Sequence, residues 1–160
     1  MENQLRPAPR PQVTVRHAVA ADVASIAPRM REDDVLECAA GSGSDPEEAL
    51  LAGLDGICFT VEVNGRPEGM FGVLGRKNEL GIVWMLGTDD LTANARVFLT
   101  DAPQWINELG RDHPVIGGFV WEPNTTHIGW LRRMGFQFFE RRLINDQPFL
   151  EFAKCVTPLP

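Results

Sequence analysis

Tyrosine is absent from this chain of 160 residues, cysteine occurs only three times, and acidic side chains outnumber basic ones by 22 to 15. Cys38, Cys58 and Cys155 lie far apart, so no pair has the spacing of a zinc knuckle or a redox dithiol. The formal net charge of -7 opposes binding to nucleic acid or to an anionic membrane, because both attract basic proteins. We therefore expect reduced thiols, no metal site, and no nucleic-acid or membrane partner.

Long apolar runs are also missing. No segment is long enough to cross a bilayer, and residues 1–12 are polar and rich in proline, unlike a signal peptide. We therefore expect that the protein is not secreted by means of a signal peptide. The hydrophobic content of 44% in 160 residues is enough for one domain with a sizeable core, but not for two. The sequence thus predicts an arm at residues 1–12 and a single domain at residues 13–157.

The arm contains the run R-P-A-P-R-P at residues 6–11. Its prolines favour extended polyproline geometry over helix or sheet. Two interpretations stay open, a segment that binds a partner protein and an inert tail.

Apolar periodicity divides the domain into strands and helices. Alternation or short apolar runs predict strands at residues 13–18, 57–63, 66–74, 80–86, 115–121, 136–143 and 149–153. Helical spacing predicts helices at residues 23–40, 46–54 and 93–109, and a short one after residue 124. Asn64-Gly65 predicts a hairpin, and Pro103 is expected to kink the third of these helices. The resulting order is β-α-α-β-β-β-α-β-α-β-β.

The chain is organised around residues 115–136, V-I-G-G-F-V-W-E-P-N-T-T-H-I-G-W-L-R-R-M-G-F. Pro123 cannot pair in a ladder, so the strand should end there. Asn124 has a side-chain oxygen that can cap the following helix, and Gly135 stands where a left-handed residue would end it. The strand end and the helix start together frame a ligand or anion site.

The spacing from Asn124 through Leu131 to Gly135-Phe136 is similar to the last coenzyme-contacting segment of the GNAT acyltransferase family. In that family an asparagine opens the helix and a G-F pair closes it. The pattern V-x-x-R-x-A-x-x-x-D at residues 13–22 resembles the opening strand and turn of these proteins. The resemblance, together with the order of elements, implies an α/β (α+β) fold with a mixed, mostly antiparallel central sheet flanked by helices.

A second and more specific resemblance covers V-W-x-x-N-T-[TS]-H-I-x-x-L at residues 120–131. It is similar to the internal virion protein A family of small tailed bacteriophages, the podophages, and includes Trp121, Asn124, Thr125, His127 and Ile128 in order. This resemblance implies a protein of the virion or the host cytoplasm. Other phage virion proteins are then the expected partners, and the proline-rich arm is a candidate contact.

The resemblance to GNAT enzymes weakens where the coenzyme would bind. In that family the fourth strand runs into a glycine-rich loop whose amides hold the pyrophosphate of coenzyme A. Residues 86–94 read L-G-T-D-D-L-T-A-N, with one glycine and with Asp89 and Asp90 where positive potential is needed. A structural role for the two acids at the helix start is the other interpretation. If coenzyme A binds, the resemblance implies that it meets Thr92, Ala93, Asn94 and Asn124.

Catalytic residues are equally sparse. The tyrosine that serves the GNAT family as general acid is replaced here by Leu131. Glu122 at the strand end and His127 one turn into the helix are the candidates for a general base. Each also has a structural interpretation, Glu122 as a solvated carboxylate and His127 as a ring packed on Trp130 or bonded to nearby backbone.

Two functions follow from these patterns. The first is a non-catalytic phage protein on a GNAT-like scaffold, which needs no cofactor and acts in virion assembly or as a virion component. The alternative is an N-acyltransferase that uses acetyl-CoA through a divergent loop, for which the strands at residues 80–86 and 115–121 must splay apart to admit the pantetheine arm. The pairs Arg132-Arg133 and Arg141-Arg142 are either a basic face near this site or solvated side chains. The oligomeric state is not predicted.

Overall fold

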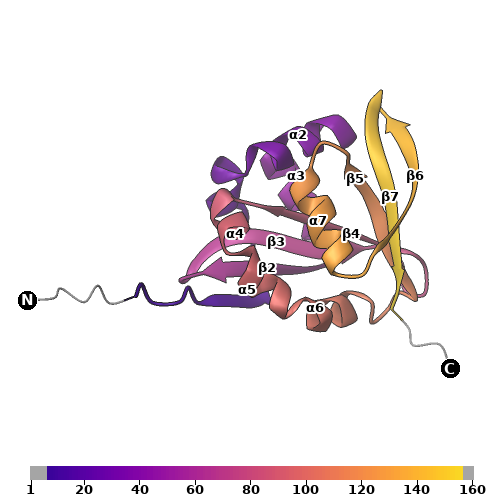
Figure 1. Cartoon of the computed structure of the whole chain (residues 1–160). Coiled ribbons are helices and arrows are strands. Elements are labelled where there is room, and N and C mark those ends of the chain that lie inside the picture. The colour runs from indigo at the N-terminus through magenta and orange to yellow at the C-terminus, as the bar shows by residue number, and fades with distance from the viewer. Residues whose placement is uncertain (1–6, 157–160) are drawn as a thin grey trace, which may run out of the picture.

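One seven-stranded sheet organises the fold in the computed structural model, which describes residues 7–156. The strands are β1 Val13–His17, β2 Ile57–Val63, β3 Arg66–Leu74, β4 Gly81–Gly87, β5 Val115–Trp121, β6 Gln137–Ile144 and β7 Gln147–Cys155. The helices are α1 Ala20–Ile26, the 3-10 helix η1 Ala27–Arg29, α2 Glu32–Gly41, α3 Pro46–Gly53, α4 Asp89–Ala93, α5 Ala95–Thr100, α6 Ala102–Leu109 and α7 Thr125–Arg133. In space the strands lie in the order β1-β2-β3-β4-β5-β7-β6 (Figure 1).

Neighbouring strands are antiparallel except for β4 and β5, which run parallel. This parallel pair is bridged at only two positions, Gly81 with Ile116 and Ile82 with Gly117. Beyond these residues the two strands separate toward their carboxyl ends. The prediction of a mixed, mostly antiparallel sheet flanked by helices is confirmed.

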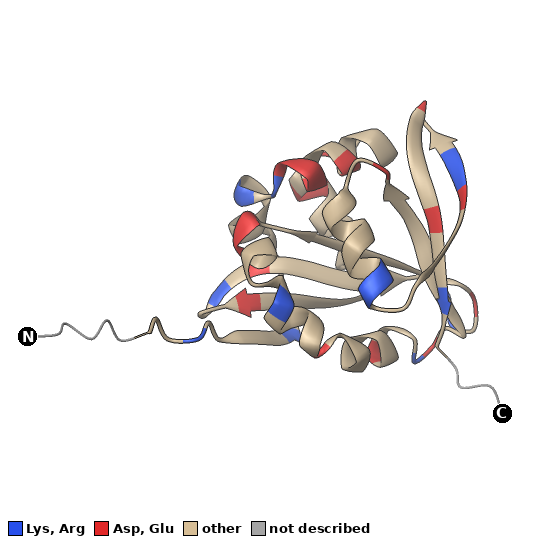
Figure 2. Cartoon of the chain, in the orientation of Figure 1, with Lys and Arg blue, Asp and Glu red and all other residues tan. Residues whose placement is uncertain are grey.

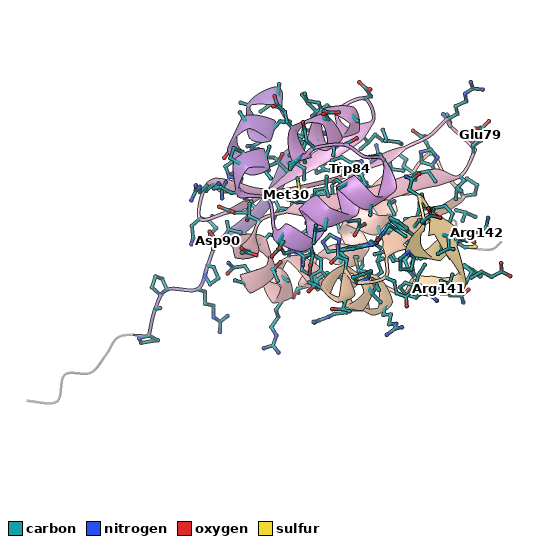
Figure 3. All side chains as sticks on the ribbon, turned by 90° about the horizontal axis from the view of Figure 1, so that it is seen from above. Met30, Glu79, Trp84, Asp90, Arg141 and Arg142 are labelled. Carbon is teal, nitrogen blue, oxygen red and sulfur yellow. The ribbon has the colours of Figure 1, made fainter. Side chains whose placement is uncertain are left out.

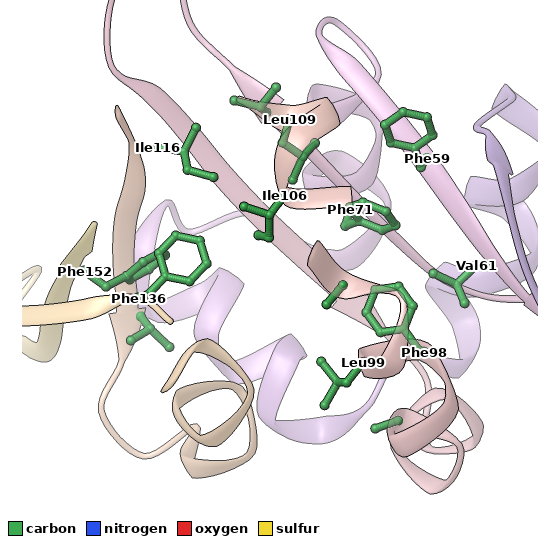
Figure 4. Packing of buried hydrophobic residues seen from close by; sticks show 14 of the residues in the cluster. Phe59, Val61, Phe71, Phe98, Leu99, Ile106, Leu109, Ile116, Phe136 and Phe152 are labelled. Atoms are coloured by element: carbon green, nitrogen blue, oxygen red, sulfur yellow. The ribbon is translucent and has the colours of Figure 1, made fainter. Parts of the chain in front are cut away.

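Helices cover both faces of the sheet, and successive residues of each strand point to opposite faces. On β3, Met70 belongs to the buried cluster under α1, α2 and α3, whereas Phe71 belongs to the cluster under α4 to α7. Figure 4 shows this second cluster, in which the rings of Phe71 and Phe98 have centroids 5.6 Å apart. Burying a side chain of this size stabilises the fold by about 2 kcal/mol. These two clusters fix both layers of helices on the sheet.

Two predicted long helices are each divided into shorter ones. The helix expected at residues 23–40 is α1, η1 and α2, because Pro28 in η1 lacks an amide hydrogen and cannot continue α1. The helix expected at residues 93–109 is divided among α4, α5 and α6. Pro103 lies in the first turn of α6, where no hydrogen bond is lost. The expected kink at Pro103 is therefore wrong, since this proline starts a helix.

Turns and caps with strong local chemistry lie where the sequence predicts them. Asn64 and Gly65 have φ angles of 50° and 81°, the left-handed pair of a two-residue hairpin. Gly135 has a φ of 89° just after α7. Asp45 caps α3, because its side chain accepts a hydrogen bond from the amide of Glu48 at 2.9 Å.

The described part of the proline-rich arm, residues 7–12, leaves the sheet at β1 and runs away from the domain (Figure 1). The predicted arm at residues 1–6, and residue 157 at the predicted domain end, lie outside the described residues. Gln12 anchors the arm, since its amide donates to Asn64 Oδ1 at 3.0 Å and its carbonyl accepts from the Asn64 amide at 2.8 Å. No helix within residues 7–156 is long and apolar enough to span a membrane.

Candidate functional site

A cavity lies in the gap that opens between β4 and β5. Its volume is about 430 Å³, within the range of small-molecule sites in proteins. Residues of α2 and α3 line it on one side of the sheet, and residues of α5, α6 and α7 line it on the other. The splayed gap that the acyltransferase alternative requires is therefore present, and side chains do not fill it.

The walls of this cavity are mainly apolar and aromatic. Trp84 of β4 and Phe149 of β7 line it, as do Trp130, Leu131 and Met134 of α7. Figure 3 shows Trp84 near the middle of the molecule, close to the N-terminal helices. Few polar side chains line the cavity. They are the carboxylate of Glu37, the hydroxyls of Ser42 and Ser44, and the imidazole of His127. This composition favours an apolar ligand with few polar groups.

Helix α2 is bonded to the end of β4 at the wide end of the gap. The carboxylate of Asp34 accepts a hydrogen bond from the Gly87 amide at 2.9 Å. The amide of Arg31, just before α2, donates to the Gly87 carbonyl at 2.8 Å. Both backbone groups of the last β4 residue are thus satisfied by the α2 segment, and none is left for a partner strand.

Asn124 bonds the same helix to the end of β5. Its Oδ1 accepts from Arg31 Nη2 at 2.7 Å, and its Nδ2 donates to Asp34 Oδ1 at 3.2 Å and to Glu37 Oε2 at 2.6 Å. Its Oδ1 also caps α7, as predicted, by accepting from the amide of His127 at 3.5 Å. Asn124 is fully buried. Every polar atom of this side chain is bonded inside the protein, which leaves none for a coenzyme.

Glu37 is the acidic side chain of the cavity wall. Burial raises the pKa of its carboxyl to about 7, while the hydrogen bond from Asn124 and one from the Trp121 amide act in the opposite direction. The negative charge of Asp34 raises this pKa further. No lysine, arginine or histidine of the described chain forms an ion pair with Glu37. A carboxyl with this pKa has the protonation behaviour of a general base at neutral pH.

His127, a predicted general base, also lines the cavity. Its Nε2 lies 3.4 Å from Asp34 Oδ1, and its ring packs on Trp130 with centroids 5.0 Å apart. Burial lowers the pKa of the imidazole more than the charge of Asp34 raises it. The ring is therefore neutral at pH 7 and packed in the way that the structural interpretation expects.

Glu122, the other predicted base, is not among the residues that line the cavity. Its Oε2 lies 2.7 Å from Arg141 Nε, an ion pair without the alignment of a hydrogen bond. The Arg141 side chain is 63% exposed and that of Glu122 40%, although the Oε2 atom of Glu122 is itself buried. Glu122 is thus engaged in an ion pair outside the cavity lining, a structural role rather than that of a base in the cavity.

The predicted coenzyme residues of α4 do not line the cavity either. Asp89 and Asp90 open a helix of only five residues, whose cap is Thr88 rather than either acid. Thr92 and Ala93 lie within it, and Asn94 follows it with Nδ2 bonded to the Asp90 carbonyl at 2.8 Å. Acidic residues are visible at this helix and on α2 (Figure 2).

The two arginine pairs do not form a basic face beside α4. Arg141 and Arg142 lie at the end of the molecule opposite Asp90 (Figure 3). Both are exposed and already paired, Arg142 with Glu151 at 3.4 Å and Arg141 with Glu122. Arg132 and Arg133 occupy the last turn of α7, where cations complement the helix dipole. The interpretation of these pairs as solvated side chains fits better than that of a phosphate-binding face.

Sequence reasoning missed Arg31, Asp34 and Glu37, which hold the polar contacts at the wide end of the gap. The run R-E-D-D-V-L-E at residues 31–37 is typical of a solvated helix face. The sequence held one signal for Asp34. It lies four residues before Cys38, so the two residues share one face of a helix. Cys38 is a buried residue type more often than not, and it is buried here.

No family model matches this chain, and no curated protein matches its sequence. Solved structures match it in fold. An acetyltransferase of the GNAT family from Bacillus anthracis has 10% identity and a TM-score of 0.67, over 90% of this chain and 95% of that one. Another from Streptococcus pneumoniae has 13% identity and a TM-score of 0.62, over 91% and 100%. An aminoglycoside acetyltransferase in complex with coenzyme A has 16% identity and a TM-score of 0.65, over 90% and 95%.

The chain has a GNAT-like fold. At these identities the similarity concerns the path of the backbone and says nothing of the activity. Within this fold, β4 and β5 splay apart and a cavity lies between them. The chain also has an acidic start of α4 and bonds from α2 that fix both strand ends.

Proposed function

We propose that this chain is a phage protein that uses the GNAT-like scaffold for protein contacts, in virion assembly or as a virion component, without transferring an acetyl group. One observation carries the proposal. The position where a GNAT enzyme would hold the coenzyme pyrophosphate has two carboxylates at the start of a five-residue helix. Such a helix offers little dipole for anion binding, and each carboxylate about 4 Å from a phosphate charge costs about 1 kcal/mol even in water.

The polar contacts of Asn124 support the same proposal. An asparagine that opens this helix contacts the coenzyme in the GNAT family, whereas Asn124 is saturated by Arg31, Asp34 and Glu37. The resemblance to the phage family rests in part on Asn124 and His127. Asn124 caps α7 and His127 contacts Asp34 of α2, so both residues help to join α2 to the end of β5. This structural role is one that a non-catalytic scaffold needs.

Exposed apolar groups at the edge of the sheet provide a surface for such contacts. β6 is an edge strand, and Phe139 and Leu143 on it are 55% and 70% exposed. The arm at residues 7–12 projects from the opposite edge, next to β1. An extended proline-rich segment and an edge strand are two common modes of protein recognition.

An N-acyltransferase is the second candidate, and the cavity is the observation that favours it. The gap between β4 and β5 is open, about 430 Å³ in volume, and apolar enough for a pantetheine arm. Glu37 at its wall, rather than Glu122, would then be the general base, since burial raises its pKa to about 7. Cofactor use would require the pyrophosphate to bind somewhere other than the start of α4.

The melting temperature with and without millimolar acetyl-CoA separates the two candidates. A ligand present at about a hundred times its Kd stabilises the folded state by about 2.7 kcal/mol, a shift of a few degrees. We expect no shift for this chain. A shift that free coenzyme A competes away would contradict the proposal and favour the transferase.

The role in assembly needs its own measurement. Deleting residues 1–12 is expected to reduce incorporation into phage particles, or capture of virion proteins, while the melting temperature falls only slightly, because the domain loses only the two bonds between Gln12 and Asn64. The matched control replaces Arg10 alone, which keeps the arm and its prolines. Full incorporation of the deleted protein would rule out the arm as a contact, and absence of the intact protein from both assembly intermediates and particles would rule out the role.

A further inference from the structure

We propose that Asn64-Gly65, at the tip of the β2–β3 hairpin, is a site of spontaneous modification, at which Asn64 loses its amide and an isoaspartyl linkage releases the arm from the domain. The reaction needs water but no enzyme, coenzyme or partner protein, so it goes beyond the proposed function. Three features of the molecule support it, namely this residue pair, its exposed turn and the bonds that tie the turn to the arm.

Asn64-Gly65 is the only asparagine-glycine pair in the sequence. In the loss of an asparagine amide, the attacking group is the backbone nitrogen of the next residue. Glycine leaves this nitrogen the least shielded, because it has no Cβ. Around Gly65 a Cβ would meet no atom within 4 Å, and both residues are exposed. Water and base therefore reach the reacting atoms.

The reaction replaces one bond at Asn64 by another, without oxidation or reduction. The Gly65 nitrogen gives its proton to solvent and bonds to Cγ of Asn64, while Nδ2 takes up a proton and leaves as ammonia. Water then opens the resulting cyclic imide. Addition at Cγ gives aspartate, whereas addition at the backbone carbonyl carbon gives isoaspartate, in which the chain runs through the side chain. The second product is the major one, because the backbone carbonyl carbon is the more electrophilic.

The contacts of Asn64 leave its side-chain amine able to depart. Its Oδ1 and its backbone amide are bonded to Gln12. Within residues 7–156, no acceptor holds its Nδ2. The φ angles of 50° at Asn64 and 81° at Gly65 are left-handed, and glycine leaves this region at little cost. The turn can therefore open far enough for the nitrogen to reach Cγ.

The β6–β7 hairpin contains a matched turn that should resist the same reaction. Asn145 and Asp146 have φ angles of 50° and 61°, so the backbone resembles that at Asn64. Two differences protect Asn145. The residue that follows it carries a side chain, and its Nδ2 donates to the Gly41 carbonyl at 2.6 Å. The chain thus holds a reactive and a protected asparagine in the same kind of turn.

An isoaspartyl linkage at position 64 removes the anchor of the arm. At present the Gln12 amide donates to Asn64 Oδ1 at 3.0 Å, and the Gln12 carbonyl accepts from the Asn64 amide at 2.8 Å. The linkage adds a methylene to the backbone and makes the Oδ1 carbonyl part of it. A two-residue turn then no longer fits the paired ends Val63 and Arg66. Both bonds to Gln12 are lost, and the arm separates from the hairpin.

Incubation of the purified protein, followed by peptide mapping and labelling with an isoaspartyl methyltransferase, tests the modification. We expect isoaspartate at position 64 to form at least about tenfold faster than at Asn145, since only Gly65 leaves its nitrogen unshielded. The rate should be higher at pH 8 than at pH 6, because the attacking nitrogen must lose its proton. Equal rates at the two turns, or no isoaspartate at position 64, would overturn the proposal.

Gly65→Asp is the matched variant, because it gives this turn the asparagine-aspartate pair of the other hairpin. Aspartate tolerates the left-handed backbone, so the turn should form. We expect the variant to slow the reaction about tenfold, and an unchanged rate would contradict the role of Gly65. If the variant does not fold, the comparison with Asn145 and the pH series on the unmodified protein decide.

Hydrogen exchange of the Gln12 amide tests the release of the arm. In the isoaspartyl protein, separated by chromatography, we expect this amide to exchange about fivefold faster or more, since a lost bond exposes it to solvent. Asn64→Asp keeps an acceptor oxygen and an unaltered backbone, so its Gln12 amide should stay protected. Equal exchange in the isoaspartyl and the unmodified protein would refute the release. Neither measurement involves phage particles, so a failure here leaves the proposed function untouched.

Discussion

Asp34 and Asp33 are adjacent acids that both contact Arg31, yet their contributions to stability should differ widely. The Asp34 side chain is 1% exposed, whereas that of Asp33 is 44% exposed. Asp34 accepts from Arg31 Nη2 at 2.7 Å, from the Gly87 amide at 2.9 Å and from Asn124 Nδ2 at 3.2 Å. Asp33 makes one contact, with Arg31 Nη1 at 3.2 Å.

Asp34→Ala therefore leaves a buried guanidinium and a backbone amide without their main partner. Removing one side of a buried ion pair costs about 3 to 5 kcal/mol, a large part of the stability of an ordinary domain. Asp33→Ala removes an exposed pair, for which about 0 to 1 kcal/mol is expected. Asp34→Asn keeps the shape and one acceptor oxygen, so its loss should lie between the two.

Urea unfolding followed by tryptophan fluorescence measures the difference. With a slope of about 2 kcal/mol per molar urea, Asp34→Ala should lower the midpoint by about 2 M, and Asp33→Ala by less than about 0.5 M. The slopes should stay equal, since the domain unfolds as before. Equal midpoints for the two alanine variants would refute the assignment of Asp34 as the residue that joins α2 to β4.

Two further predictions concern single residues of the same region. Glu37 has a pKa of about 7 in the folded protein against an ordinary value of 4.5, so between these pH values the folded state binds one proton more than the unfolded state. The free energy of unfolding should therefore fall by a few kcal/mol between pH 4.5 and pH 7, relative to that of Glu37→Gln. Above pH 7 the two free energies should change in parallel. A constant difference between the two urea titrations would argue against the raised pKa. Gly129 lies within α7 with open space where a Cβ would stand, so Gly129→Ala should raise the unfolding free energy by about 1 kcal/mol, and a loss of stability would mean that the helix surface there is occupied.

Local chemistry explains which parts of the fold were predictable. Asn64-Gly65 and Gly135 need left-handed backbone, and Asn124 caps the residues that immediately follow it, so neighbours in sequence decide each of these features. The alternation of apolar residues also gave the strands, with β2, β3 and β5 at the predicted bounds. The two long helices were predicted wrongly because the apolar periodicity continues across Pro28 and Asp101, whereas the α-helical backbone is interrupted there.

The candidate site was less predictable, because its contacts join distant parts of the chain. Arg31 and Asn124 are 93 positions apart, and Asn124 and Glu37 are 87 apart. In the sequence, Glu37 is one of several acidic residues on the same helix. It lines the cavity only because α2 packs against the end of β5. Glu122 was predicted because it follows the end of a strand, but its side chain pairs with Arg141 and does not line the cavity.

Specific contacts fix the gap between β4 and β5 at both ends, so it is a built feature and not a packing defect. At the narrow end a Cβ on Gly81 would lie 2.7 Å from the His113 ring, and one on Gly117 would lie 2.3 Å from the Phe152 carbonyl oxygen. Glycine is therefore required where the strands pair. At the wide end Asp34 and Asn124 fix the strand ends to α2. The cavity therefore has a shape that specific contacts at both ends of the gap define.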